Sequence, residues 1–120
     1  MHIKNAKDVR AFQSEHGEVV YELIGAAAGG SQTYSLAQIM LPPGKASLKH
    51  YHPVAEESYH ILSGVGRIEM DGETASLKPG DSIAILPNQV HRIFNEGDEN
   101  LIFLAICVPA WTPDNSIYLD

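Results

Sequence analysis

The sequence predicts an all-β protein, a small antiparallel barrel, and three observations lead to that prediction. Short stretches rich in β-branched and aromatic residues are separated by turns that contain glycine, proline, asparagine or aspartate. Residues 67–71 alternate between polar and apolar side chains, as a strand does when one face is wet and the other is buried. No stretch of about ten residues carries the apolar stripe of an amphipathic helix. Strands joined by short turns, without helices, are typical of a β-barrel.

Length and composition limit the number of domains and the classes of partner. With 120 residues the chain can form one core, so we treat residues 1–120 as a single domain. A hydrophobic fraction of 44% with 19% charged residues is ordinary for a globular protein and excludes disorder. The net charge is −7 and there are only 8 lysines and arginines, which leaves no basic stripe. Nucleic acid and anionic membranes are therefore poor partners.

The two ends of the chain and its cysteine usage predict where the protein works. The N-terminus has no apolar signal region, and the longest apolar run, residues 101–111, is far shorter than the ~20 residues that span a bilayer. The single cysteine, Cys107, cannot form an internal disulfide. We expect a soluble protein and, because unpaired cysteine suits a reducing compartment, a cytoplasmic one.

The first predicted strands follow a polar N-terminal arm, residues 1–18, whose two histidines we interpret as solvated surface groups. Residues 19–24 are rich enough in β-formers for the first strand, and a loop of small residues follows it. The next strand is expected over residues 34–41 and ends at Pro42-Pro43-Gly44.

The strand over residues 34–41 carries a glutamine between two large apolar side chains. Leu36, Gln38 and Met40 share one face of this strand, because successive side chains point to opposite sides. If that face looks into the barrel, Gln38 becomes a neutral hydrogen-bonding group inside it. The alternative is an exposed amide on a strand that is apolar on both faces.

Two further strands are expected to form hairpins in the middle of the chain. Residues 57–62 are predicted to pair with residues 67–71 across the turn between them. Asp71-Gly72 is a type I′ hairpin signal, with residues 73–77 as the returning strand.

The remaining strands close the predicted fold. Residues 82–86 follow a tight Lys-Pro-Gly-Asp turn, and a hairpin over residues 95–100 leads to the almost wholly apolar strand 101–108. The tail, residues 109–120, shows no helix signal, so we expect it to lie over the barrel or over a partner subunit.

The residues that suggest chemistry lie between the second and third strands, where two imidazoles and two carboxylates occur within the nine residues 49–57. On an extended strand His50 and His52 share one face, about 6.6 Å apart along the chain. Pro53 should turn the chain and bring Glu57 back towards both rings. Imidazole with carboxylate suits Zn, Fe, Mn, Ni or Cu, and the absence of thiolate argues against a cysteine-rich zinc site. The alternative is a set of exposed polar loop residues.

The spacing of these residues forms a longer pattern. The run from Gly44 through His50, His52 and Glu57 to Gly64 reproduces the first motif of the cupin superfamily, G(X)5HXH(X)3,4E(X)6G. The run that begins at Gly80 resembles the second motif, G(X)5PXG(X)2H(X)3N, with the spacing to His91 and Asn95 kept. It departs from that motif at two positions, because Leu86 stands where the family usually has proline and Asn88 where it has glycine. Asparagine accepts positive φ more readily than other non-glycine residues, so the turn can survive the exchange.

Over residues 36–108 the chain therefore resembles a small single-domain cupin of the cupin 2 type, with a barrel over about 34–108. The resemblance implies a jelly-roll barrel of roughly six to eight strands. It also implies one divalent transition metal ion held by His50, His52, Glu57 and His91. Glu56 is the rival of Glu57, but the six residues between Glu57 and Gly64 fit the family spacing. Adjacent side chains on a strand also point to opposite faces, so only one of the two can be a ligand.

Two functional classes fit such a protein. Four protein ligands leave about one or two positions on the ion, which could polarise a substrate oxygen or bind dioxygen. We therefore expect a metalloenzyme of dioxygenase, isomerase or lyase type, and the alternative is a non-catalytic module that binds a small molecule or a metal. The catalytic candidates are Glu57, Tyr59 and Gln38. Tyr59 lies two residues after Glu57 and so points to the same face of the strand. His60 shares the parity of Glu56 and should point outward.

Strand parity also predicts the substrate class. Lys49 and Arg92 each adjoin a proposed ligand and so point outward, and Arg67 lies on the wet face of its strand. The expected interior residues are Gln38, Met40, Tyr59, Ile61, Ile83, Ile85 and Ile93. With no cation inside, we expect a small neutral or singly charged substrate that binds the metal through oxygen, whereas sugar phosphates and nucleotides are disfavoured. An apolar C-terminal strand and an aromatic tail suggest a homodimer.

Overall fold

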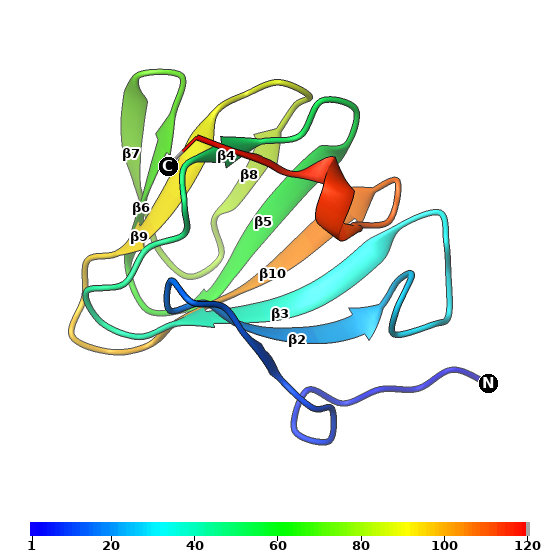
Figure 1. The fold of residues 1–120 in the computed structure, drawn as a ribbon. Coiled ribbons are helices and arrows are strands. Elements are labelled where there is room, and N and C mark those ends of the chain that lie inside the picture. The colour runs from blue at the N-terminus through cyan, green and yellow to red at the C-terminus, as the bar shows by residue number, and fades with distance from the viewer. Residues whose placement is uncertain (120) are drawn as a thin grey trace.

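The computed structural model describes residues 1–119, which form two antiparallel sheets (Figure 1). The larger sheet has the order β1-β2-β3-β10-β5-β8, and the smaller one has the order β11-β4-β9-β6-β7. The strands of the larger sheet are β1 (Phe12–Gln13), β2 (Val19–Ile24), β3 (Ser35–Leu41), β10 (Leu101–Val108), β5 (Glu56–Ser63) and β8 (Ser82–Ile85). Those of the smaller sheet are β11 (Ile117–Tyr118), β4 (His50–Tyr51), β9 (His91–Asn95), β6 (Gly66–Met70) and β7 (Glu73–Leu77).

One hydrophobic core lies between the two sheets. Alternate residues of β5 and β10 are buried, which is the period of two expected when one face of a strand is covered. The core contains Leu41, Tyr59, Ile61, Ile68, Leu77, Ile85, Ile93, Leu101, Phe103 and Ala105. Because both sheets contribute to this cluster, they pack face to face as a jelly roll, and hydrogen bonds do not close them into a continuous barrel.

The structure confirms the all-β fold class and most of the predicted strand positions. β2, β7 and β10 have the predicted bounds, β3 begins one residue later than predicted, and β6 is shifted by one residue at both ends. The turn at Asp71 and Gly72 has φ of 50° and 84°, the positive values that a type I′ hairpin requires. Asn88 has φ of 70°, so asparagine does take the left-handed conformation in place of glycine.

Two predicted hairpins are wrong, and both errors concern the passage between sheets. β5 pairs with β10 and β8, whereas β6 pairs with β7 and β9, so residues 63–66 join the two sheets. Likewise β9 and β10 belong to different sheets, and the turn between them is not a hairpin. Neighbouring strands in sequence pair often, but a jelly roll repeatedly sends consecutive strands to opposite layers.

Gly64 permits one of these crossings. Its φ is +86°, and a Cβ added there would lie 2.6 Å from the carbonyl oxygen of Asn100 and 2.8 Å from Cα of Leu101. The two crossing segments therefore pass each other at backbone distance, which only glycine allows.

The prediction that Gln38 and Met40 line the interior is wrong. Ile39 and Leu41, on the other face of β3, pack into the core. Gln38 pairs with Leu104, which in turn pairs with His60, and these residues form the outer face of the larger sheet. Both faces of β3 carry large apolar side chains, so parity alone could not say which one is inside.

The tail follows the last core strand back across the molecule (Figure 1). It forms a 3₁₀ turn, η1 (Pro113–Asn115), and then β11, which pairs with β4. The prediction that it lies over the barrel is therefore confirmed. No helix within residues 1–119 is long and apolar enough to cross a membrane.

The crossing at Gly64 gives a test of the fold. Gly64→Ala should lower the free energy of unfolding by about 1–3 kcal/mol more than Gly72→Ala, because its methyl group also overlaps backbone atoms. Gly72 is a matched control, since its φ is +84° and nothing lies within 4 Å of an added Cβ. Both variants should lose roughly 1–2 kcal/mol to the left-handed conformation alone. Denaturant titration measures both losses, and equal losses would contradict the proposed close approach.

Candidate metal centre

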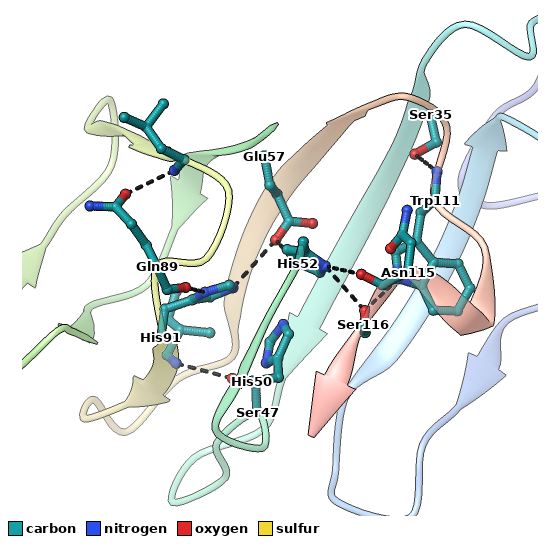
Figure 2. A network of polar contacts seen from close by, with 12 residues as sticks. Ser35, Ser47, His50, His52, Glu57, Gln89, His91, Trp111, Asn115 and Ser116 are labelled. Atoms are coloured by element: carbon teal, nitrogen blue, oxygen red, sulfur yellow. Dashed lines mark hydrogen bonds and ion pairs between the residues drawn. The ribbon is translucent and has the colours of Figure 1, made fainter. Parts of the chain in front are cut away.

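The four predicted metal ligands meet at one end of the molecule, from both sheets (Figure 2). His50 begins β4, His52 follows that strand, and His91 begins β9, where it pairs with His50. Glu57 projects from β5 in the opposite sheet. One ligand atom of each residue lies within 4.8 Å of those of the others, and all four residues are buried.

Hydrogen bonds fix which nitrogen of each ring faces the centre of this cluster. Nδ1 of His50 lies 2.7 Å from the carbonyl oxygen of Leu48, and Nδ1 of His91 lies 2.9 Å from that of Gln89. Nδ1 of His52 lies 3.1 Å from the carbonyl oxygen of Asn115. A carbonyl oxygen can only accept, so each Nδ1 carries the proton and each Nε2 remains for a ligand. This is the arrangement that metal-binding histidines adopt.

The Nε2 atoms of His52 and His91 converge on the carboxylate of Glu57. Oε1 of Glu57 lies 3.1 Å from Nε2 of His52 and 3.5 Å from Nε2 of His91. Within residues 1–119 the buried Nε2 of His91 has no well-formed hydrogen bond. A buried nitrogen without a hydrogen-bond partner is rare, and a metal ion between nitrogen and carboxylate would satisfy it. The residues present thus fit a divalent transition metal ion.

The protonation states also suit a cation. Burial and the nearby His91 lower the pKa of His50 to about 4, so its imidazole is neutral at pH 7. Burial opposes ionisation of Glu57, but the hydrogen bond from His52 and the nearby ring of His91 outweigh it and lower the pKa of Glu57 to about 2. Burial also opposes the charged form of His52, yet its hydrogen bond to Glu57 raises its pKa. A proton on Nε2 of His52 therefore occupies the place that a metal ion would take.

Comparison with known proteins shows the family of this chain. The model of the Cupin domain family matches residues 37–107. The chain belongs to the cupin superfamily.

Two relatives and one solved structure show how this cupin is related to others. It is 30% identical over 112 residues to an uncharacterized protein of Methanocaldococcus jannaschii, and the aligned region covers 93% of this chain and 90% of that protein. It is 32% identical over 93 residues to the oxalate-binding protein of Thermotoga maritima, and the aligned region covers 77% of each chain. The crystal structure of a predicted oxalate decarboxylase from Thermotoga maritima matches with a TM-score of 0.81 and 24% sequence identity. The match covers 91% of this chain and 99% of that one. At that identity the last likeness shows the fold alone.

Tyr59 and Cys107 adjoin Glu57 inside the cupin. The Tyr59 ring lies 6.2 Å from the ring of His91, and burial followed by the charge of Glu57 raises the pKa of Tyr59 well above its usual value. Cys107 is buried and pairs with Glu57 across the sheet. Burial and the same charge raise the pKa of Cys107 to about 12. Both residues therefore stay neutral, and Cys107 lies outside the cluster of possible ligands.

Other candidates lie away from the centre. Glu56 is exposed while Glu57 is buried, as the spacing argument predicted. His60 points outward, where its Nδ1 lies 2.7 Å from Oγ of Ser82. Gln38, on the outer face of β3, cannot orient a substrate at the cluster.

Sequence reasoning missed Glu18, a carboxylate on the inner side of the larger sheet. Glu18 directly precedes β2 and has the parity of Val20, which pairs with Ile39 beside the core. It is half-buried, and its carboxylate has no hydrogen-bond or ion-pair partner within residues 1–119. Burial and then the negative charge of Glu57 raise the pKa of Glu18 to about 7. The parity of β2 extends to Glu18, but this residue lies just outside the strand, in the arm that we interpreted as polar and solvated.

Sequence reasoning also missed the part that the tail plays at the centre. We call residues 111–119 the C-terminal strap. Besides the Asn115 carbonyl, the strap brings Oγ of Ser116 to 3.2 Å from Nδ1 of His52 (Figure 2). No local pattern in the sequence links residues 115 and 116 to a histidine more than sixty positions earlier.

The proton on His52 predicts how metal binding depends on pH. Because the pKa of His52 is raised, affinity for a divalent transition metal should fall as the pH falls below that value, by about tenfold per pH unit for one displaced proton. Calorimetry of metal-free protein between pH 8 and pH 5 measures this slope, and buffers of different ionisation enthalpy count the released protons. His52→Ala should remove stoichiometric binding. An affinity that stays constant over this range would contradict the assignment.

Proposed function

We propose that this cupin is a metal-dependent enzyme that acts on a small neutral or singly charged metabolite through its oxygen atoms. The observation that carries the proposal is the convergence of three imidazoles and one carboxylate in a buried cluster, with a second carboxylate, Glu18, within electrostatic reach. A bound divalent ion would supply Lewis-acid chemistry, and four protein ligands would leave room for a substrate oxygen. Reactions of dioxygenase, isomerase or lyase type fit such a centre.

The residues of the chain would divide the remaining tasks. His50, His52, Glu57 and His91 would hold the ion. Tyr59, a neutral phenol beside Glu57, could orient a substrate by hydrogen bonding. Glu18 is suited to transfer a proton, because a general acid or base works best when its pKa lies near the operating pH.

The positions of the cations support the substrate class. None of the lysines and arginines in residues 1–119 is buried, and all except the half-buried Arg92 are exposed. Arg67 pairs with Glu96 at 2.8 Å, on the outer face of the smaller sheet. Phosphate recognition needs cationic forks or a helix N-terminus, which the inner side of the sheets does not offer among these residues. A small carboxylate held by the metal is a better fit. The relative named for oxalate binding shares the carboxylate chemistry, although oxalate carries two charges at neutral pH.

A non-catalytic binding module is the second candidate. The same cluster could capture a small carboxylate without breaking a bond, and the relative from Thermotoga maritima is named an oxalate-binding protein, not an enzyme. Glu18 favours the enzyme, because a carboxylate with a pKa raised to about 7 is suited to exchange a proton in a reaction.

Assembly and location belong to the same proposal. We propose a homodimer that covers part of the outer face of the larger sheet, where Ile106 is 40% and Val108 is 45% exposed beside Leu36. The free, buried Cys107 is compatible with a cytoplasmic location.

The test of the proposed enzyme is reconstitution with Fe(II), Mn(II), Ni(II) and Zn(II) separately, followed by turnover assays. The substrate panel contains oxalate, hydroxy acids, diketones and sugar phosphates. Turnover should appear with at least one metal and a small oxygen-bearing acid or ketone. Glu18→Gln should then lose about 100-fold or more in kcat while metal binding is kept, because general acid–base catalysis contributes about that much.

Glu15→Gln is the matched control, since Glu15 is exposed on the same arm. Binding of a panel compound without turnover by any metal form would favour the binding module. Tight binding of a sugar phosphate to metal-free protein would contradict the substrate class.

A further inference from the structure

The hydrogen bonds at the three histidines differ in where their partners come from. His50 and His91 each bond the carbonyl of the residue two positions earlier, so the local strand backbone fixes these rings. The partners of His52 lie 63 and 64 positions later, in the C-terminal strap. The orientation of the His52 ring thus depends on the C-terminal strap, which lies outside both sequence motifs.

The strap is attached mainly to segments that carry the ligands. The Trp111 amide donates to Oγ of Ser35 at 2.9 Å, and its indole Nε1 donates to Oγ of Ser116 at 3.0 Å. Further along, Ile117 pairs with Tyr51 and Tyr118 with His50, and the Leu119 amide donates to the carbonyl of Lys49 at 3.0 Å. The Tyr118 ring lies 5.5 Å from the ring of His50. Contacts on both sides of His52 therefore place Asn115 and Ser116 against it.

We propose that the strap is a structural part of the metal centre, in which Asn115 and Ser116 are positioning residues for His52, and that strap docking and metal binding strengthen each other. The strap holds the His52 ring through Nδ1, and the metal would hold the same ring through Nε2. Whichever binds first restricts the ring, so the second loses less conformational freedom. Linkage requires the effect to be the same in both directions. This inference rests on the proposed metal site but not on turnover.

The first test measures metal affinity in strap variants. Ser116→Ala removes the hydroxyl that bridges Trp111 and His52, and Trp111→Phe removes the indole donor and leaves a smaller aromatic ring. Each should weaken Co(II) binding, measured by calorimetry, by up to about tenfold, and removal of residues 111–120 should weaken it by about 10- to 100-fold. The Co(II) absorption bands should also shift in Ser116→Ala, because the His52 ring is less constrained.

Thr112→Val is the matched control within the strap. The Thr112 hydroxyl hydrogen-bonds the Asp114 carboxylate and does not touch His52. This variant should bind Co(II) with wild-type affinity and an unchanged spectrum. If Thr112→Val and Ser116→Ala lose affinity equally, the strap acts only through general stability and the proposal is wrong.

The second test is decided on the wild-type chain, with His52→Ala as the comparison. Hydrogen exchange of the amides of Asn115 and Leu119 is followed in the intact chain with and without Zn(II). The Leu119 amide donates to the carbonyl of Lys49, outside the strap, and so reports docking directly. The Asn115 amide donates to the carbonyl of Thr112 and reports the 3₁₀ turn that presents Asn115 to His52. Zn(II) should slow their exchange in the wild type and leave it unchanged in His52→Ala.

Strap exchange that does not respond to Zn(II) in the wild type, although Zn(II) binds, would overturn the proposal. Neither test uses a substrate, so absence of turnover would count against the enzyme and leave the linkage intact.

Discussion

The orientation of three imidazole rings around one carboxylate is the constraint on which the rest of this structure depends. Four polar side chains are buried together, and burial of unpaired polar groups is costly. The arrangement is tolerated because three backbone carbonyl oxygens each accept a hydrogen bond from an Nδ1–H group. Glu57 in turn lies beside the inward-facing Nε2 atoms of His52 and His91. Since His50, His52 and His91 come from one sheet and Glu57 from the other, the cluster also sets how the two sheets meet at this end.

The electrostatics of the centre extend beyond the four candidate ligands. Glu57 is ionised, and its charge adds to burial in raising the pKa values of Tyr59, Cys107 and Glu18. A carboxylate such as Glu18, half-buried and without a partner in the part of the chain described, reduces stability at pH values above its pKa. Groups with strongly shifted pKa values gather at functional sites, so such a cost is expected where a protein binds or transforms a ligand.

The sequence predicts the strands and the ligand set well because both depend on short-range spacing. Period-two alternation identified β6, the Asp71-Gly72 turn identified β7, and the positions of His50, His52, Glu57 and His91 follow from two motifs. Features that depend on which layer a strand joins were not predictable in this way. β5 and β6 are consecutive and separated by a short turn, yet they enter different sheets, and only the close approach at Gly64 reveals why.

The same limit applies to the site. The face of β3 that enters the core is ambiguous, because Leu36 and Met40 are as apolar as Ile39 and Leu41, and so Gln38 was placed on the wrong side. Ser116 contacts His52 although 64 positions separate them in the sequence, and no local periodicity encodes a contact of that separation. Long-range placement of single polar residues therefore required the three-dimensional structure.

The most direct test of the account is X-ray absorption at the zinc edge of protein loaded with one equivalent of Zn(II). The account predicts three imidazole nitrogens at about 2.0–2.1 Å together with oxygen scatterers in the wild type. Fewer than three imidazoles in the wild type, or a sulfur scatterer at about 2.3 Å, would contradict the assignment of the centre.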